Sequence, residues 1–372
     1  MKVLMLSIDN KIFEKGSAVR ARMIDYGTLF DELHVVVYTK PGFVQENIAP
    51  NVFLYPTNTK IKLFYFWHAY RLSKKILNTK YQIPNTSWVV TSQEAATNLV
   101  AMLLKWRFGI RFQAQVHTDF ASPYFKKESL KNRLRYWGYV WGLRKADCIR
   151  VVSKRISDSL AELGIKNYES RTAVLSIFVD AQKIKNAEPF LPKPFDFTVL
   201  WVGRLEKEKN CSLAIDAFAQ FARNVPDAGL VIVGNGNEYE DLRFKISDLR
   251  MQDKILLSGW RDDVAGYYKS ADVLLATSWY EGYGMQMVEA RIAGIPVIAP
   301  DIGMAKEIGA YIAEHSADSI SHMLTQLYAR KLPTPKEYQY SYENKEQYLA
   351  LYKQSFETCL LAPLEENKKN AS

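Results

Sequence analysis

The sequence contains only three cysteines in 372 residues, Cys148, Cys211 and Cys359. An odd number at such wide spacing excludes a disulfide framework and a cysteine zinc cluster, and it suits a reducing compartment. The chain also lacks an apolar run of roughly 18–20 residues, which a membrane-spanning helix would need. Its first residues, MKVLMLSIDN, have the pattern of a strand and not of a signal peptide. We therefore expect a cytoplasmic protein.

Composition and length are those of a folded protein with two domains. Hydrophobic residues make up 48% and charged residues 24% of the chain, which excludes disordered, collagen-like and coiled-coil proteins. The length exceeds the roughly 250–300 residues at which a single core stops growing. Residues 188–197 (EPFLPKPFDF) contain three prolines, which favour a linker. We predict a first domain over 1–187, a second over 198–345, and a C-terminal helix with a polar tail over 346–372.

Short β-rich apolar runs alternate with helical patterns in both halves. Such alternation predicts a parallel sheet covered on both faces, and hence two doubly wound α/β domains facing a central cleft, with the last helix packing back across them. Ligands bind such folds at the carboxyl ends of the strands. The runs are Lys2–Ser7, Leu33–Tyr38, Trp88–Thr91, Arg111–His117 and Cys148–Val152 in the first half, and Thr198–Val202, Gly229–Val233, Ile255–Ser258, Val273–Ala276 and Ile295–Ile298 in the second.

Positive charge is concentrated in the first half of the chain. Residues 1–190 hold 29 Lys and Arg against 15 Asp and Glu, a balance of +14, and the remainder hold 20 against 25, a balance of −5; together they give the net +9. Such charge suits nucleic acid, anionic lipid or a phosphorylated substrate. The sequence has no helix-turn-helix, finger or RNP-type pattern, so we expect no nucleic-acid partner.

The most informative stretch is ATSWYEGYGMQMVEARIAGIPVIAP, residues 276–300. It reads as a strand, a turn with Gly282 and Gly284, and a helix from about Met285. Free amides and the positive dipole end of a helix start bind phosphate readily. Glu281 in the turn and Glu289 in the helix can then face one bound molecule. The alternative is a tight turn followed by a solvated helix glutamate.

Two other loops follow predicted strands of the second half. In VGRLEKEKN, residues 202–210, Arg204 and Lys209 can neutralise a diphosphate, unless the segment is only a solvated run of alternating charge. The Gly234-Asn235-Gly236 segment lacks the third glycine of a dinucleotide fingerprint, because Tyr239 stands there. We interpret it as a turn, which disfavours a dehydrogenase.

Together these motifs resemble the GT-B glycosyltransferases, most closely the retaining family GT4, over nearly the whole chain. The strongest part is the E-x7-E pattern from Glu281 to Glu289, followed by AGIPVIAP. The G-R-x4-K pattern of Gly203, Arg204 and Lys209 fits as well, as do SGW at 258–260 and YYKSADVLLATS at 267–278. The resemblance implies a GT-B fold with two Rossmann-like domains.

The resemblance also implies a role for each matching residue. Arg204 and Lys209 would hold the diphosphate of a nucleotide sugar, Glu281 would contact the transferred sugar, and Glu289 would bind the ribose hydroxyls. The remaining donor-binding positions are the amides of Gly284 and Met285, with Tyr283 beside them, and Trp260 and Arg261 against the base. The family generally uses no metal, and adjacent Asp262 and Asp263 do not form a D-x-D pair, so we expect no metal and no cofactor.

The first half supplies the expected acceptor side. His117 ends an apolar strand and matches the active-site histidine of the family, where it would bind a sugar hydroxyl or assist proton movement. Gly16 matches the glycine-rich first loop, although this loop has a single glycine. A strand-end histidine with a purely structural role is the alternative.

Residues 59–80 (TKIKLFYFWHAYRLSKKILNTK) mix basic and aromatic side chains, and a similar stretch covers 125–145. This mixture suits the face of an anionic leaflet. We predict a membrane or acceptor face formed by Lys62, Trp67, Arg71, Lys74 and Lys75. An ordinary helix with buried aromatics and solvated lysines is the alternative.

The resemblance therefore predicts a retaining glycosyltransferase. It would move a sugar from a UDP- or GDP-sugar to a glycan or lipid-linked acceptor, in cell-surface polysaccharide or glycoconjugate synthesis, at the inner face of the cell membrane. Two alternatives remain: a nucleotide-sugar epimerase of the same fold, and a catalytically silent membrane-associated partner.

Overall fold

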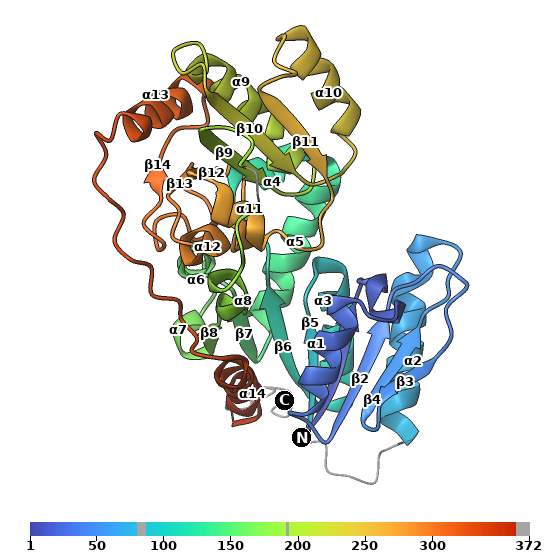
Figure 1. The fold of residues 1–372 in the computed structure, drawn as a ribbon. Helices are drawn as coiled ribbons and strands as arrows, with labels where there is room; N and C mark the ends of the chain where they lie inside the picture. The colour runs from blue at the N-terminus through green and yellow to red at the C-terminus, as the bar shows by residue number, and fades with distance from the viewer. Residues whose placement is uncertain (80–86, 191–192, 362–372) are drawn as a thin grey trace. The chain divides into compact units, whose positions relative to one another are not determined.

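A computed structural model describes residues 1–79, 87–190 and 193–361 (Figure 1). The chain divides into two compact units, one formed by 1–176 with the C-terminal segment from residue 344, the other by 177–343. The first unit therefore ends at residue 176 and not at residue 187, where the proline-rich segment had placed the end of the first domain. Helix α8 (Ala181–Lys185) explains the difference, because it packs on α11 (Ala265–Ser270) and α12 (Met285–Ile292) of the second unit. Residues 191–192 of the predicted linker and the tail from 362 lie outside the described residues.

The first unit contains an eight-stranded sheet in the order β3-β4-β2-β1-β5-β6-β7-β8. Neighbouring strands are parallel except β3 against β4. The strands are β1 (Lys2–Ser7), β2 (Glu32–Val37), β3 (Glu46–Ala49), β4 (Val52–Pro56), β5 (Trp88–Ser92), β6 (Arg111–Val116), β7 (Cys148–Val151) and β8 (Thr172–Val174). The central strands are almost wholly buried, as expected of a parallel sheet covered on both faces.

Helices and short 3-10 turns connect these strands. They are η1 (Asn10–Phe13), α1 (Ala18–Gly27), η2 (Lys62–Phe64), α2 (Tyr65–Thr79), α3 (Ala95–Phe108), α4 (Pro123–Glu128), α5 (Leu130–Lys145), α6 (Lys154–Glu162) and α7 (Tyr168–Arg171). Several begin at a serine whose hydroxyl accepts a hydrogen bond from the first turn, such as Ser17 before α1 and Ser153 before α6.

The C-terminal helix α14 (Lys345–Leu361) belongs to the first unit, where it packs on β5, β6 and β7. Tyr352 stacks on Tyr26 with ring centroids 4.2 Å apart, and Phe356 meets Phe30 edge-on at 5.0 Å. Both α14 side chains are fully buried. Burying an aromatic side chain of this size contributes roughly 1.5–3 kcal/mol. The last helix therefore completes a core that the first residues of the chain begin.

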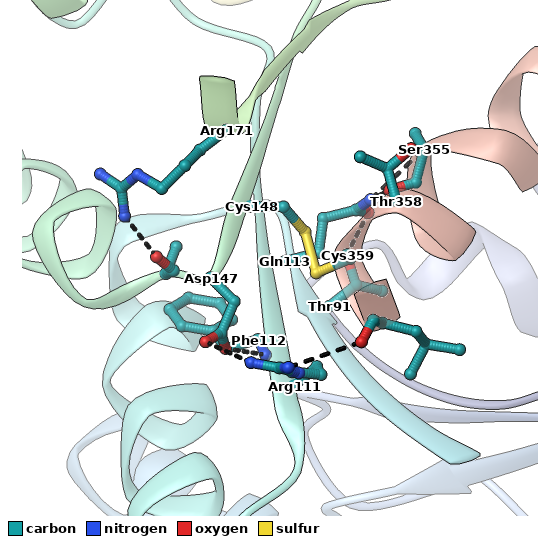
Figure 2. Close-up of a disulfide and its surroundings, with 12 residues drawn as sticks. Thr91, Arg111, Phe112, Gln113, Asp147, Cys148, Arg171, Ser355, Thr358 and Cys359 are labelled. Atoms are coloured by element: carbon teal, nitrogen blue, oxygen red, sulfur yellow. Dashed lines mark hydrogen bonds and ion pairs between the residues drawn. A yellow bond between two sulfur atoms is a disulfide. The ribbon is translucent and has the colours of Figure 1, made fainter. Parts of the chain in front are cut away.

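A disulfide joins Cys148 at the start of β7 to Cys359 in α14, with the Cα atoms 5.3 Å apart (Figure 2). The prediction that the cysteines are unpaired is therefore wrong for these two, and Cys211 alone is a free thiol. The two partners are separated by 211 positions in the sequence. The two cysteines are close only because α14 packs on the first sheet, and their spacing in the sequence does not indicate this packing. The cysteine argument for a reducing compartment does not hold.

The second unit contains a six-stranded parallel sheet in the order β11-β10-β9-β12-β13-β14. The strands are β9 (Phe197–Val202), β10 (Ala228–Val233), β11 (Ile255–Gly259), β12 (Val273–Leu275), β13 (Val297–Ala299) and β14 (Tyr311–Ile312). Besides α8, α11 and α12, the unit contains η4 (Lys207–Lys209), α9 (Cys211–Phe221), α10 (Tyr239–Asp248) and α13 (Ala317–Tyr328). The prediction of two doubly wound α/β units with parallel sheets is confirmed.

Candidate functional site

The candidate donor site lies at the carboxyl ends of β9 and β12. Strand β9 is the third strand of its sheet, with β10 on one side and β12 on the other. The chain leaves β9 toward β10 and β11 and later returns on the opposite side with β12. At such a topological switch point the two following loops diverge, and ligands bind in the crevice between them. Arg204 and Lys209 follow β9, whereas Glu281 and Gly284 follow β12.

Lys209 and Glu281 meet at this position. The Lys209 ammonium donates to Oε1 of Glu281 at 2.5 Å, and both side chains are largely buried, at 17% and 10% exposure. Oε1 also accepts from the Ser278 hydroxyl at 2.9 Å and from the Gln286 amide at 3.2 Å. The carboxylate is therefore charge-paired and fixed by two neutral donors, an arrangement that keeps a partly desolvated ion pair in one geometry.

Backbone and side-chain bonds hold the two loops together. The Thr277 hydroxyl donates to the carbonyl of Asn210 at 2.9 Å and accepts from the Trp201 indole at 3.1 Å. The amide of Trp279 donates to the carbonyl of Glu208 at 2.9 Å. Because these hydrogen bonds join the end of β12 to the turn after β9, they fix the relative position of the two loops that carry Lys209 and Glu281.

Arg204 has a different environment. Its side chain is 63% exposed and donates to the carboxylate of Glu208, four positions farther along the chain, at 2.9 Å. In this structure the guanidinium is thus free to reorient, since an exposed ion pair of this kind contributes little. The two cations that the sequence grouped are each neutralised by a different glutamate.

The start of α12 requires glycine. Gly284 precedes the helix with φ +82°, a left-handed conformation that other residues adopt with strain, and its carbonyl accepts from the amide of Met287 at 3.0 Å. A Cβ at Gly284 would lie 2.3 Å from the Met287 methyl group. Tyr283 is buried, and Met285 is 40% exposed at the first turn. The first amides of a helix lack intrahelical acceptors, which leaves them available to an anion.

Glu289 lies on α12 about one turn beyond that start. The buried hydroxyl of Tyr268, from α11, donates to its carboxylate at 2.7 Å. Burial raises the pKa of Glu289, and the Tyr268 hydrogen bond and the charge of Lys183 oppose that rise. A partly buried carboxylate with one fixed donor retains lone pairs for further hydroxyl groups.

Trp260 and Arg261 follow β11 at the same edge of the sheet. Trp260 is 58% exposed and its indole donates to Asp262 at 3.0 Å. Arg261 donates to the hydroxyl of Tyr267 at 3.2 Å, and that ring stacks on Phe190 with centroids 5.0 Å apart. Both predicted base-contacting residues are accessible.

The Gly234-Asn235-Gly236 segment is a turn after β10, as predicted. A Cβ at Gly234 would lie 1.8 Å from the carbonyl oxygen of Gly203, and one at Gly236 would lie 2.4 Å from that of Leu205. The glycines therefore allow this turn to pack on the backbone of the loop that carries Arg204. Their role is close packing beside the candidate site.

Two family models match adjoining parts of the chain. The model described as Glycosyltransferase Family 4 matches residues 30–183, and the model described as Glycosyl transferases group 1 matches residues 182–347. Together they cover most of the sequence. The chain belongs to the group 1, family 4 glycosyltransferases.

Curated relatives and solved structures agree with this family. The UDP-Gal:alpha-D-GlcNAc-diphosphoundecaprenol alpha-1,3-galactosyltransferase of Escherichia coli is 26% identical over 193 residues, 44% of this chain and 50% of the relative. The first curated relatives are matched over 60% of their length or less. Sucrose-phosphate synthase from Thermosynechococcus elongatus (TM-score 0.71, 18% identity, 97% and 94% coverage) shares the GT-B fold. So does Anabaena Alr3699/HepE in complex with UDP (0.67, 16%, 97% and 95%).

His117, in the first unit, directly follows β6. Its Nε2 atom is buried and has no hydrogen-bond partner among the residues that the structure describes. Burial, with the nearby charges of Arg150 and Arg22, lowers the pKa of His117 to about 3. The imidazole is therefore neutral at physiological pH and has an unused nitrogen. Gly16 has φ +84° just before α1, in the loop after β1.

The predicted membrane face of this family member is accessible. Lys62 in η2 and Trp67, Arg71, Lys74 and Lys75 in α2 are all exposed, whereas Ala69, Ser73, Ile76 and Leu77 form the buried side of that helix. No helix within the described ranges 1–79, 87–190 and 193–361 is long and apolar enough to cross a bilayer. In the same ranges, no three His, Cys, Asp or Glu side chains are grouped to hold a metal ion.

Sequence reasoning missed the residues that support the site. Ser278 and Gln286 bind Glu281, and Tyr268 binds Glu289. His315 accompanies them: its Nε2 lies 2.9 Å from the carbonyl oxygen of Ser278, and its ring stacks on Trp279. Ser278 and Gln286 are within five positions of Glu281 and could have been considered from that spacing. Tyr268 lies within the YYKSADVLLATS run at 267–278, but nothing in that run indicates its contact with Glu289. His315 comes from a separate segment, and no local pattern points to it.

Proposed function

We propose that the protein is a retaining glycosyltransferase that moves a sugar from a UDP- or GDP-sugar to a glycan or lipid-linked acceptor. The observation that carries the proposal is the Lys209–Glu281 pair beside the glycine-initiated start of α12. One cation, one carboxylate and a set of amide donors are what a diphosphate and a sugar together require. The Escherichia coli relative is named for a UDP-sugar donor and a diphospholipid acceptor, and the Anabaena neighbour was solved with UDP, which supports this choice of substrates.

The proposed donor binds by exchanging partners with the protein. Its diphosphate takes the Lys209 ammonium, the reoriented Arg204 guanidinium and the amides of Gly284 and Met285. Glu281, released in part from Lys209, accepts hydrogen bonds from the transferred sugar. Glu289 accepts from the ribose hydroxyls, with Tyr268 fixing its other oxygen, and Trp260, Arg261 and Tyr283 complete the nucleotide site.

Bond cleavage at the anomeric carbon then develops negative charge on the diphosphate and positive charge on the sugar ring. Lys209 and the helix amides stabilise the leaving group most where that charge appears, and Glu281 lies near the cationic ring. These fixed groups act in place of a divalent ion, so we expect turnover without one. Among the described residues we assign no carboxylate as a covalent nucleophile, and we propose a front-face reaction with retention.

His117 is proposed to bind a hydroxyl group of the reacting sugars. Because its pKa is lowered to about 3, the ring acts as a neutral hydrogen-bonding group and not as a cation. Gly16 allows the loop after β1 to approach the substrates. We propose that the acceptor binds the first unit, whose η2–α2 face of Lys62, Trp67, Arg71, Lys74 and Lys75 meets the anionic cytoplasmic leaflet. The work of the enzyme would then be glycoconjugate synthesis at the inner face of the cell membrane.

The proposal is tested by donor screening and product release. Thermal shift with UDP, GDP and ADP and their sugars identifies the nucleotide, because a ligand that binds the folded state raises its apparent stability. Release of the nucleoside diphosphate is then measured with lipid-linked acceptors, with and without a chelator. Conversion of the donor to an epimer without acceptor would indicate the epimerase instead. Binding of neither nucleotide nor sugar would indicate a silent partner.

A further inference from the structure

Helices α2, α3 and α5 of the first unit lie side by side, with α3 packed between the other two. Their sequences contain no aspartate or glutamate. They contain ten basic residues: three in α2 (Arg71, Lys74, Lys75), two in α3 (Lys105, Arg107) and five in α5 (Lys131, Arg133, Arg135, Arg144, Lys145). Ion pairs engage Lys105 with Asp147 and Arg135 with Glu94. The layer is therefore strongly positive over three helices and not at one point.

The outer surface of the same layer carries large apolar side chains. On α5 the exposed residues Leu130, Leu134, Trp137 and Trp141 recur at intervals of four, three and four, which aligns them on one side of the helix. Their exposed fractions are 75%, 75%, 64% and 53%.

Helix α3 presents a matching row. Leu103 and Trp106 are exposed, Trp106 by 81%, and Leu99 continues the row by one turn. Leu99 lines a groove of about 410 Å³ together with Leu134, Trp137 and Trp141 of α5. Leu99 therefore joins the α3 row to the groove beside α5, and we call the two rows together the α3–α5 surface (Leu99, Leu103, Trp106, Leu130, Leu134, Trp137 and Trp141).

We propose that the α3–α5 surface is the apolar anchor by which the protein docks on an anionic lipid bilayer. Exposed apolar surface of this extent marks an interaction site. Tryptophan is favoured at the boundary between water and lipid, where its ring lies among the headgroups. The surrounding basic side chains are spread over three helices that contain no acid. They therefore complement an extended plane of anionic headgroups better than they would complement a single acidic peptide segment.

This inference deepens the proposed function by naming the part of the protein that enters the lipid. It rests on that function because a lipid-linked acceptor is what gives the docking its use. In this arrangement Arg71, Lys74 and Lys75 of α2 attract the protein to the bilayer, whereas Trp106, Trp137 and Trp141 penetrate it. The electrostatic attraction by the basic residues requires anionic lipid, whereas the penetration by the tryptophans does not.

Vesicle binding by the full-length protein tests the inference. Vesicles contain phosphatidylcholine with phosphatidylglycerol, or phosphatidylcholine alone, and no donor or acceptor is present. Trp137→Ser/Trp141→Ser should lower the bound fraction on anionic vesicles at least tenfold. Phe244→Ser, a change at an exposed aromatic residue of the second unit, is the matched control and should bind like the wild type. Lys74→Glu/Lys75→Glu should abolish the preference for anionic over neutral vesicles.

A second measurement detects penetration directly. Lipids brominated on their acyl chains should quench the tryptophan fluorescence of the wild type, and Trp137→Ser/Trp141→Ser should lose most of that quenching while its affinity for UDP stays unchanged. Equal sedimentation or equal quenching of the two proteins would overturn the inference. Concentration-dependent dimerisation that the tryptophan substitutions abolish, without vesicle binding, would assign the surface to a second copy and also overturn it. Failure of glycosyl transfer with intact vesicle binding would instead count against the proposed function alone.

Discussion

Replacing Lys209 by methionine should affect stability and catalysis through separable causes. In the folded protein the substitution leaves the Glu281 carboxylate, which is 10% exposed, with only the neutral donors Ser278 and Gln286. Removing one partner of a buried ion pair costs ~3–5 kcal/mol. Because two hydrogen bonds remain, we expect a loss of about 3 kcal/mol in the free energy of unfolding, measured by urea denaturation. Turnover should fall by roughly 10²–10³ because a group that stabilises the leaving diphosphate is lost.

The double variant Lys209→Met/Glu281→Gln separates the two effects. Neutralising Glu281 removes the unpaired charge, so stability should recover by about 1–3 kcal/mol, a coupling energy typical of residues in contact. Turnover should stay as low as in Lys209→Met or fall further. Lys207→Met, at an exposed lysine in the same turn, is the control and should leave both quantities unchanged. If turnover returns together with stability in the double variant, Lys209 has only a structural role and the reasoning is refuted.

Three further predictions concern Glu289 and the disulfide. Glu289→Ala should weaken UDP binding roughly 10–100-fold by calorimetry, the value of hydrogen bonds to a charged group, and an unchanged dissociation constant would remove Glu289 from the ribose site. Burial raises the pKa of Glu289, and the ribose requires its carboxylate form. UDP affinity should therefore be full above that pKa and fall as the pH drops through it. Glu289→Gln should lack this pH dependence, with only the titration of UDP itself remaining. Cys359→Ser should lower the free energy of unfolding by ~2–5 kcal/mol in denaturation without reductant, whereas equal stability would argue against the cross-link to Cys148.

The fold was largely predictable because its central strands are apolar and buried. The predicted runs at Lys2–Ser7 and Arg111–His117 match β1 and β6 to within one residue. Strands β3, β4, β8 and β14 were not predicted, since they are short and only partly buried, and β14 has two residues. The assignment of α8 to the second unit depends on packing between distant segments, which periodicity does not report.

The candidate site was predictable as a set of loops but not as a set of contacts. The order of the strands was enough to place Lys209 and Glu281 at the same edge of one sheet. Their ion pair joins residues 72 positions apart, and nothing local in the sequence indicates it. Conversely, the Arg204–Glu208 pair joins residues four positions apart in a loop of alternating charge, so a contact there could have been anticipated from the sequence. The sequence therefore predicted that the loops of Lys209 and Glu281 lie at one sheet edge, and the structure shows that the two side chains form an ion pair there.

The return of α14 to the first sheet has a consequence for synthesis of the protein. Residues 1–176 emerge from the ribosome long before residue 344, yet Tyr26 and Phe30 acquire their packing partners only when Tyr352 and Phe356 have been made. The later-made second unit is continuous in sequence and can reach its final form first. A nascent chain stopped before residue 344 would expose an aromatic surface that invites aggregation. Completion of the first unit's aromatic core, and with it protection of residues 1–176 from misfolding, therefore has to wait for synthesis of α14.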